Sequence, residues 1–402
     1  MLTTAEATRA ISESMPAFRS ETVSLNNANG RILRQLVCAE RDQPPFDRVT
    51  MDGIAISWSG FESGNRVFAI QGRQHAGQAR QTLADSSACI EIMTGAVLPA
   101  NTDCVIPVER IRVSDQSATL EQDYVPRRHQ YIHAQGSDHK KKHKLLDDGH
   151  RIEAVDIAII ASCGLASLEV SAQPRIAVIS TGDELVAAGQ PIADHQIRSS
   201  NGPAIAAMLE SHGYSGCEQD HLTDNRQQLA ERLARHLQEA DVLILSGGVS
   251  MGKADFVPEV LQQLGVKVTF HKISQRPGKP MWFGIGPDSQ AVFALPGNPV
   301  STLVCCRQYV LPALAGASGR RASRGEYAVL GENFTFAAAL TCFLPVRLDA
   351  GDDGLLLATP VPTNTSGDFA ALSGTDGYLE LAQDVTEFPA GSRWPLHRWG
   401  AL

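Results

Sequence analysis

The hydrophobic positions near the N-terminus repeat with the period of an amphipathic helix, and Thr3 and Glu6 form a capping box at its start. The apolar face of this expected helix contains Ala7, Ile11, Met15 and Phe18. A second helical pattern covers residues 153–163 and ends at Gly164, a residue type that suits a helix C-terminus. Because the two helices flank a segment of different texture, we expect them to pack together as one discontinuous domain.

Between these helices, from residue 26 to about 137, short β-type runs such as RVFAIQG, ACIEIMTG and DCVIPVE are separated by Gly, Pro and Asn, which predicts a mostly β domain. From Pro174 strands and helices alternate. The expected strands are RIAVIS, DVLIL, KVTF, MWFGI and AVFAL, and the expected helices cover about 202–212, 225–239, 257–264 and 299–315. Asp224 is the expected N-cap of the second of these helices. Such alternation predicts a largely parallel sheet covered by helices, and beyond Gly316 the texture is β again.

The predicted fold class is therefore α/β plus β in a multidomain chain. We expect a discontinuous helical domain at 1–44 and 139–173, an inserted β domain at 45–138, an α/β domain at 174–317 and a C-terminal β domain at 318–402. A chain of 402 residues is long enough for roughly two to four such domains.

Composition narrows the class of function. The net charge of −9 argues against broad nucleic-acid binding, which needs an excess of Lys and Arg, so any anionic ligand must be held locally. The eight cysteines show no CxxC spacing, and we expect reduced, mostly buried thiols. Neither a long apolar run nor a secretion signal is evident, so the expected location is cytoplasmic, with no membrane contact.

Three expected strand ends carry unusual sequences: STGDE at 180–184, SGGVSMGKAD at 246–255 and LPGNPVS at 295–301. In an open α/β sheet, ligands bind at the carboxyl ends of the strands. Gly247 and Gly248 remove side-chain bulk, so backbone N–H groups can approach an anion. Each segment alone is better explained as a tight turn, but three of them on one sheet indicate a phosphate-binding site.

Charged residues beside these turns sharpen the prediction. Asp183, Glu184, Asp224 and Asp255 would repel a phosphate unless a cation lies between them, which suggests Mg²⁺ with a phosphorylated ligand. Arg276 and Lys279, in QRPGKP, supply cations for the anion. The run HKKKHK at 139–144 is more simply explained as a solvated loop.

These segments together resemble the molybdopterin molybdotransferase family, MoeA in bacteria and the E domain of gephyrin. The matching stretches are MDGIA (51–55), IMTGAVLP (92–99), STGDEL, SGGVSMGKADF, RPGKP and LPGNPVS. They occur in the family's order and span nearly the whole chain. The resemblance implies four subdomains, the last barrel-like, in an elongated homodimer whose active site is shared between subunits. It also implies that adenylylated molybdopterin and molybdate are substrates, that a divalent cation is used, that AMP is released, and that a molybdopterin adenylyltransferase is a partner.

The resemblance also implies residue roles. Asp52, from the partner copy, and Glu184 would position metal or molybdate, and Thr94, Asp138, Asp224 and Asp255 match further active-site positions. The expected substrate-binding set is Ser246, Gly247, Gly248, Ser250, Lys272, Arg276, Lys279, Pro296, Gly297, Asn298 and Pro299, with Arg347 and Ser366 for a terminal phosphate.

Three positions depart from the family pattern. HAQGSD at 133–138 stands where the family has an arginine-rich approach to an acidic motif, Ser199 stands where an aspartate is common, and Ile54 replaces Tyr or Phe. These departures keep open a divergent paralogue that binds a pterin or acts as a scaffold without efficient metal insertion. A nucleotide-hydrolysing enzyme that shares only the α/β domain, as in competence-damage-inducible proteins, is a third alternative, against which MDG and IMTGA speak because they lie outside that domain.

Overall fold

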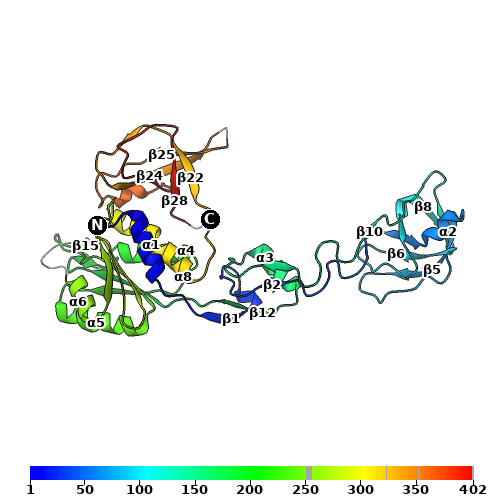
Figure 1. The fold of residues 1–402 in the computed structure, drawn as a ribbon, viewed down its shortest axis with the longest axis horizontal. Helices are drawn as coiled ribbons and strands as arrows, with labels where there is room; N and C mark the ends of the chain where they lie inside the picture. The colour runs from blue at the N-terminus through cyan, green and yellow to red at the C-terminus, as the bar shows by residue number, and fades with distance from the viewer. Residues whose placement is uncertain (250–255, 323, 352–353, 401–402) are drawn as a thin grey trace.

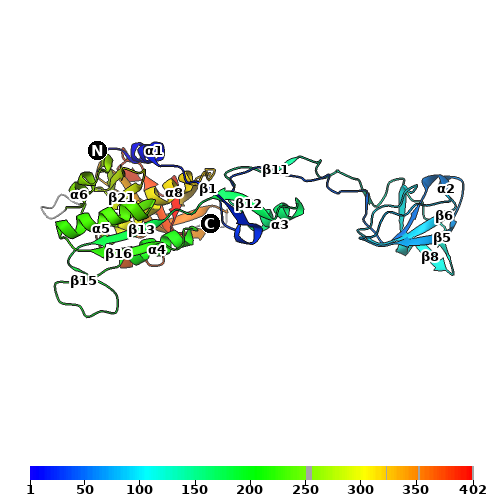
Figure 2. The same ribbon diagram turned by 90° about the horizontal axis from the view of Figure 1, so that it is seen from below.

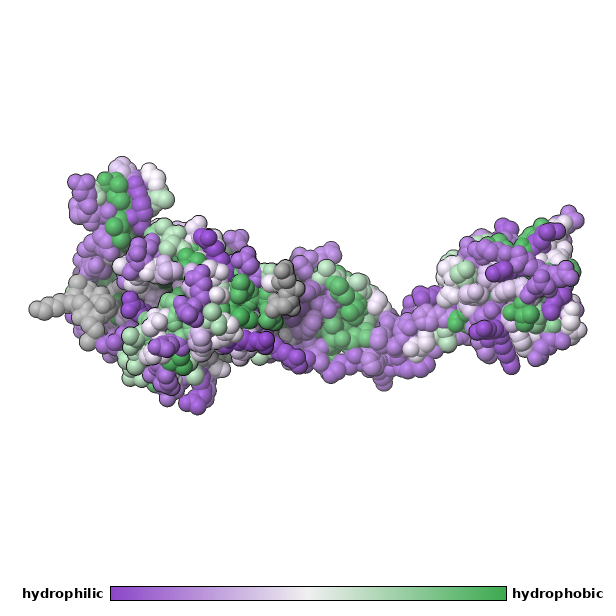
Figure 3. Space-filling view, turned by 90° about the horizontal axis from the view of Figure 1, so that it is seen from above, coloured by the Kyte–Doolittle hydropathy of each residue, from purple (hydrophilic) through white to green (hydrophobic). Residues whose placement is uncertain are grey.

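The computed structural model describes residues 1–249, 256–322, 324–351 and 354–400. The molecule is elongated, with an α/β unit and a β barrel side by side at one end, a small unit in the middle and a separate β unit at the far end (Figures 1 and 2). The chain passes out to the far unit and returns. In the space-filling view this connection is a narrow, mostly hydrophilic neck (Figure 3).

The α/β unit is built on a sheet with strand order β16, β13, β17, β21, β20, β18. β16, β13, β17 and β21 are parallel, β20 is antiparallel to both of its neighbours, and β18 therefore runs in the same direction as the four parallel strands. The predicted largely parallel sheet is therefore confirmed. Its strands are β13 (Ile176–Thr181), β16 (Glu218–Leu222), β17 (Val242–Ser246), β18 (Lys267–His271), β20 (Trp282–Ile285) and β21 (Ala291–Leu295), and the short β14 (Leu185–Val186) and β15 (Ile197–Arg198) pair beside it. Its helices are α4 (Asn201–Ser211), α5 (Arg226–Glu239), α6 (Val257–Gln263), α7 (Pro299–Cys305), the π-helical η3 (Cys306–Val310) and α8 (Leu311–Ala317).

Two details of the helices differ from expectation. Asn225, not Asp224, caps α5: its side chain accepts hydrogen bonds from the backbone N–H groups of Gln227 and Gln228. The continuous helix from α7 to α8 is long and apolar enough to cross a membrane, yet 72% of its most apolar stretch is buried inside the protein. It is the core helix of the α/β unit, where Tyr309, Val310 and Leu314 pack.

The N-terminal helix α1 (Thr4–Ser14) has the predicted capping box and the predicted apolar face. Its partner differs from the expectation. Ala7 and Ile11 pack into the α/β core with residues of β13, β18 and α8, whereas α3 (Ala154–Ser162) belongs to another core. α1 and α3 do not pack together, because the apolar face of α1 is buried against the α/β unit instead. The N-terminus lies beside this unit (Figure 1).

The middle unit joins two distant segments. β1 (Ser20–Ser24) pairs with β12 (Ser167–Ser171), and β2 (Val37–Cys38) pairs with β11 (Lys144–Leu146); η1 (Leu25–Asn27) and α3 complete it. The far β unit contains a sheet with order β7, β4, β6, β5, β9, β8. Its elements are β3 (Arg48–Val49), β4 (Gly53–Ile56), α2 (Trp58–Glu62), β5 (Val67–Gln74), β6 (Ala88–Ile92), β7 (Cys104–Pro107), η2 (Val108–Arg110), β8 (Ile111–Ser114), β9 (Ser117–Leu120) and β10 (Ile132–His133).

The C-terminal unit is a closed barrel. Among the described residues, β24, β25, β22, β28 and β26 form a ring, because β26 pairs back to β24. Closure leaves these strands without open edges. The elements are β22 (Glu326–Leu330), β23 (Phe334–Thr335), β24 (Thr341–Ala350), β25 (Leu356–Pro360), η4 (Phe369–Leu372), β26 (Gly377–Leu381), β27 (Glu387–Phe388) and β28 (Arg393–Arg398).

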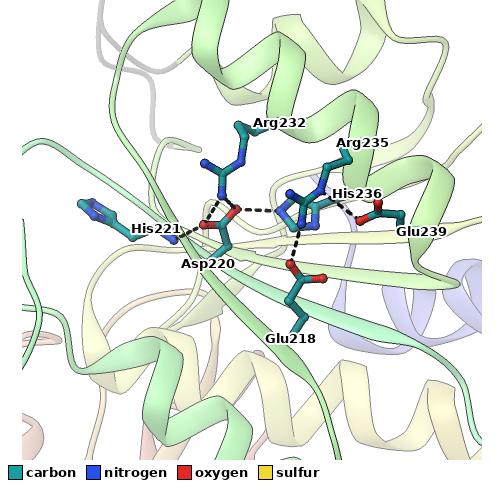
Figure 4. A network of polar contacts seen from close by, with 7 residues as sticks. All are labelled: Glu218, Asp220, His221, Arg232, Arg235, His236 and Glu239. Carbon is teal, nitrogen blue, oxygen red and sulfur yellow. Dashed lines mark hydrogen bonds and ion pairs between the residues drawn. The ribbon is translucent and has the colours of Figure 1, made fainter.

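The edge strand β16 is attached to helix α5 by a polar network (Figure 4). Asp220 accepts hydrogen bonds from Arg232 at 2.6 Å and from the fully buried His236 at 2.7 Å, and Glu218 accepts one from Arg235. Burial alone would raise the pKa of Asp220, but the hydrogen bond from His236 and the charge of Arg232 outweigh it and lower that pKa. The ionised carboxylate holds the charged edge strand against the helix.

All eight cysteines are free thiols, and most are buried, as predicted. Burial raises the pKa of Cys89 and of Cys104 to about 12, so both thiols stay protonated at neutral pH.

The barrel is joined to the α/β unit by buried polar contacts around Glu380. Its carboxylate accepts hydrogen bonds from Thr4 of α1 at 3.2 Å and Gln308 of η3 at 3.3 Å, and it contacts His397 at 3.0 Å. Tyr378 donates to Gln308 at 2.8 Å. Burial would raise the pKa of Glu380, but these partners, His397 foremost, lower it.

We therefore expect Glu380→Gln to lower the free energy of unfolding at neutral pH by about 1–3 kcal/mol. The folded-state pKa of Glu380 lies below its ordinary value of about 4.3, so its stabilising effect is complete above that value and is lost as the pH falls through the lower folded pKa. Urea unfolding between about pH 7 and pH 3 should show the gap between variant and parent closing on the acid side. Glu387→Gln, an exposed change on the same barrel, is the control; a gap that is constant with pH contradicts the assignment.

Strand β17 ends in two glycines that lie against β13. Gly247 has φ +100°, and a Cβ there would meet the Thr181 carbonyl oxygen at 2.6 Å. At Gly248, with φ +65°, a Cβ would meet the Val257 side chain at 2.7 Å. Both positions therefore need glycine for conformation and for space.

Gly247→Ala separates these two effects when it is compared with Gly189→Ala. Gly189 has φ +84° but open space around its Cα, so that change should cost about 1–2 kcal/mol for the left-handed backbone alone. Gly247→Ala should cost about 1–3 kcal/mol more, because backbone must shift. Denaturant unfolding of both variants measures the difference, and equal losses would show that the crowding at Gly247 is relieved without cost.

Candidate active site

Three neighbouring parallel strands deliver the predicted glycine- and proline-rich turns to one cavity. β13, β17 and β21 are adjacent in the sheet, and their carboxyl ends line a space of about 1210 Å³ between the α/β unit and the barrel. The turn after β19 (Gln275–Arg276) lines it as well. The predicted residues on its wall are Glu184, Asp224, Ser246, Gly247, Gly248, Arg276, Lys279, Pro296, Gly297, Asn298, Pro299 and Ser366.

The other predicted residues lie elsewhere. Lys272, at the end of β18, and Arg347, exposed on β24, are not part of this wall among the described residues. Ser250 and Asp255 fall outside the residues that the structure describes. Asp52, Thr94 and Asp138 belong to the far β unit, well separated from the cavity within one chain (Figure 1).

Asn201, at the start of α4, connects two of these turns, those that follow β17 and β21. Its side-chain amide donates to Ser246 Oγ at 2.8 Å, to the carbonyl of Gly297 at 2.8 Å and to Thr302 Oγ1 at 3.2 Å. Asn201 thereby holds the ends of β17 and β21 in a defined relation. The sequence alone does not single out this asparagine, because its hydrogen-bond partners are distant in the chain.

The barrel closes the cavity from the opposite side. Asn298 donates to Ser366 Oγ at 2.6 Å, and Val300 N–H donates to the Ser366 carbonyl at 3.1 Å. β19 also pairs with β24 of the barrel, with Gln275 opposite Thr341 and Arg276 opposite Cys342. The cavity therefore depends on the two units being docked.

Carboxylates and cations meet in this cavity. Glu184 and Asp224 line it, and Asp183 accepts a hydrogen bond from the backbone N–H of Asp224 at 3.0 Å. Arg276 and Lys279 lie on the same wall. Thr181 also borders the cavity, and its buried hydroxyl has no hydrogen-bond partner among the described residues.

Within the described residues no group of three or more His, Cys, Asp or Glu side chains could hold a metal by itself. This donor set still fits Mg²⁺, which commonly takes one or two protein carboxylates together with phosphate oxygens and water. A magnesium ion here would be bound jointly with a phosphorylated ligand.

The far β unit carries a second constellation. Asp52, just before β4, accepts hydrogen bonds from the backbone N–H of Thr94 at 2.6 Å and from its hydroxyl at 2.7 Å. These bonds lower the pKa of Asp52, so the exposed carboxylate is ionised at neutral pH. The glycine of the MDG motif is required here, because a Cβ on Gly53 would meet the Ile106 carbonyl at 1.9 Å.

Arg48 is a residue that sequence reasoning missed. Strands β3 and β10 place Arg48 opposite His133, and its guanidinium lies 3.0 Å from His133 Nδ1. His133 Nε2 in turn contacts Asp138 at 2.8 Å. A positive charge thus stands near Asp138 although the local sequence HAQGSD lacks arginine. Only the pairing of two distant segments reveals it.

Comparisons with known proteins agree with this architecture. Three family models match the chain: "MoeA N-terminal region (domain I and II)" over residues 2–164, "Probable molybdopterin binding domain" over 177–316 and "MoeA C-terminal region (domain IV)" over 327–396.

Relatives named molybdopterin molybdenumtransferase include one from Synechocystis, 39% identical over 99% of this chain and 100% of its own length. Another, from Haemophilus influenzae, is 34% identical over 80% of this chain and 79% of its own length. The crystal structure of a molybdopterin biosynthesis MoeA protein from Pyrococcus horikosii is similar over the full length of both chains, with a TM-score of 0.85 and 27% identity. The chain therefore belongs to the MoeA family of molybdopterin molybdenumtransferases.

Proposed function

We propose that this protein inserts molybdenum into molybdopterin. It takes adenylylated molybdopterin and molybdate, releases AMP and leaves molybdenum on the dithiolene sulfurs of the pterin. The observation that carries this proposal is the cavity between the α/β unit and the barrel, where glycine-lined strand ends, the carboxylates of Glu184 and Asp224, and cations that include Arg276 and Lys279 converge. This combination suits a ligand with several negative charges.

The residues of the cavity divide the work by their chemistry. Gly247 and Gly248 let backbone approach the nucleotide, and Arg276 and Lys279 attract phosphate and molybdate oxygens. Glu184 and Asp224 would hold Mg²⁺, which neutralises charge on the phosphoanhydride when it is bound. Ser246, Pro296, Gly297, Asn298 and Pro299 shape the pocket, and Ser366 closes it from the barrel.

A second copy of the chain completes the site in this proposal. Asp52 and Thr94 form a preorganised, exposed acidic site on a lobe that lies far from the cavity of its own chain (Figure 1). A homodimer in which each far lobe reaches the other copy's cavity would bring Asp52 to Glu184 and so to the metal or molybdate. Asp138 would belong to the same shared edge.

The substrate's chemistry implies the setting of the reaction. An adenylylated pterin is the product of an adenylyl transfer, so a molybdopterin adenylyltransferase is the expected partner. We propose a cytoplasmic location, where such a biosynthetic step has its nucleotide supply.

Mixed dimers test both the activity and the shared site. We expect Asp52→Asn and Glu184→Ala each to lower molybdate-dependent AMP release by about 100-fold or more, because each removes charge stabilisation at the reacting centre. Mixing the two variants should restore about a quarter of parent activity, since about half the dimers are mixed and each of these carries one intact site out of two.

Asp123→Asn in the far unit and Glu210→Ala on α4 are the matched controls, because both are exposed acids away from these sites. If mixing restores nothing while both variants remain folded and dimeric, the shared site is wrong. If the parent binds the pterin but releases no AMP with molybdate, the protein is the non-catalytic pterin-binding alternative.

A further inference from the structure

All the aromatic residues on the described wall of the cavity come from the barrel, and the α/β side contributes none. Phe334, Phe336 and Phe369 all line the cavity, together with Leu340. Phosphate and metal binding do not require aromatic rings. The aromatic rings on this wall therefore need an explanation other than the binding of phosphate or metal.

Two of the rings are held from behind by the barrel. Phe334 lies in β23 and Phe336 directly follows this strand, and both side chains are partly buried and pack against the barrel core. β23 pairs with β27, and the ring centroid of Phe334 lies 6.3 Å from that of Phe388 in the barrel. The backbone N–H of Phe336 donates to the Thr386 carbonyl at 2.9 Å. Phe336 is thus presented to the cavity from a supported backbone.

The third ring is unusually exposed. Phe369, at the start of η4, has 48% of its surface accessible to solvent. It follows the loop in which Ser366 is bonded to Asn298 and Val300 of the α/β unit. Because about half of this side chain is exposed on the cavity wall, a ligand that covers it would remove further apolar surface from water.

A cation lies beside the rings. The Arg276 guanidinium carbon is 5.9 Å from the centroid of the Phe336 ring, and Lys279 lines the same cavity. The backbone of Arg276 is paired with β24 of the barrel, which fixes the point from which its side chain extends. An aromatic face next to two cations suits a flat ring that carries a phosphate.

We propose that Phe336 and Phe369 form a stacking platform for a planar heterocycle of the substrate, with its phosphate directed toward Arg276 and Lys279. The heterocycle is either the adenine or the pterin, which share a flat π face. This inference rests on the proposed function for the identity of the ligand. It adds two aromatic residues that select for the ring.

Binding measurements with three probes test the platform. AMP and a pterin phosphate each carry a ring, and ribose 5-phosphate lacks one. We expect Phe369→Leu and Phe336→Leu to weaken binding of at least one ring probe about 10-fold, within the range for loss of a base stack, and to leave ribose 5-phosphate binding unchanged. Arg276→Gln should weaken all three, and the ring probe that loses affinity in the Leu variants identifies the stacked heterocycle.

The controls separate stacking from general damage. Phe369→Tyr keeps the ring and should bind as the parent does. Tyr327→Leu removes a barrel aromatic residue that is 60% exposed outside the cavity wall and should have no effect. If Phe336→Leu fails to fold, the exposed Phe369 decides the question.

Three results would overturn the platform: equal affinity of the parent for ribose 5-phosphate and the ring probes, no binding of either ring probe, or parent-like binding by the Leu variants. Failure of the proposed function has a different signature. In that case the parent shows ring-dependent binding but no molybdate-dependent AMP release.

Discussion

The docking of the barrel onto the α/β unit is the constraint on which the site depends. Its centre is Gln275, fully buried, whose strand β19 belongs to the α/β segment of the chain but pairs with β24 of the barrel. The Gln275 side chain accepts a hydrogen bond from Tyr309 and donates to the Pro277 carbonyl at 3.1 Å. These two bonds lie within the α/β unit and fix β19 as the strand with which β24 pairs. Undocking would break the β19–β24 pairing and the hydrogen bonds of Gln308 with Glu380 and Tyr378, which would leave buried polar groups without partners at a cost in free energy. The adjacent Arg276 is therefore positioned at the cavity by the β19–β24 pairing, which also holds the two units together.

This docking brings opposite chemistries to face each other. Small and charged residues follow the ends of the parallel strands, while the closed barrel contributes aromatic rings and the Ser366 loop. Neither wall alone encloses a ligand. The chain is acidic overall, with a net charge of −9, so attraction for an anion has to come from local cations such as Arg276 and Lys279 and, in our proposal, from a divalent ion.

The site on the far β unit does not depend on the docking of the barrel. Its acidic site is organised locally, since Thr94 fixes Asp52 and the pairing of β3 with β10 brings Arg48 to His133. The narrow neck holds this unit away from the cavity of the same chain (Figure 3). A complete site therefore needs a second copy in our proposal, and the elongated shape is what allows one copy to reach another.

The sequence by itself determined the elements whose signals are local. The capping box of α1, the alternation of strands and helices after Pro174 and the glycines that end β17 follow from short-range patterns, because periodicity and left-handed backbone need no distant partner. The motifs likewise indicated which strand ends carry chemistry. Asn225 displaced Asp224 as the cap of α5, since two adjacent residues can both serve and only the backbone conformation selects one.

Tertiary structure decided the contacts between segments far apart in the chain. It packed α1 on the α/β sheet rather than on α3, set Arg48 beside His133, joined the ends of β17 and β21 through Asn201, and placed Phe336 and Phe369 on the wall of the same cavity. It also left Lys272 and Arg347 off the described cavity wall. Such contacts depend on how whole units dock. The residues adjacent in the sequence do not determine which distant surface a side chain contacts, so local patterns cannot predict these contacts.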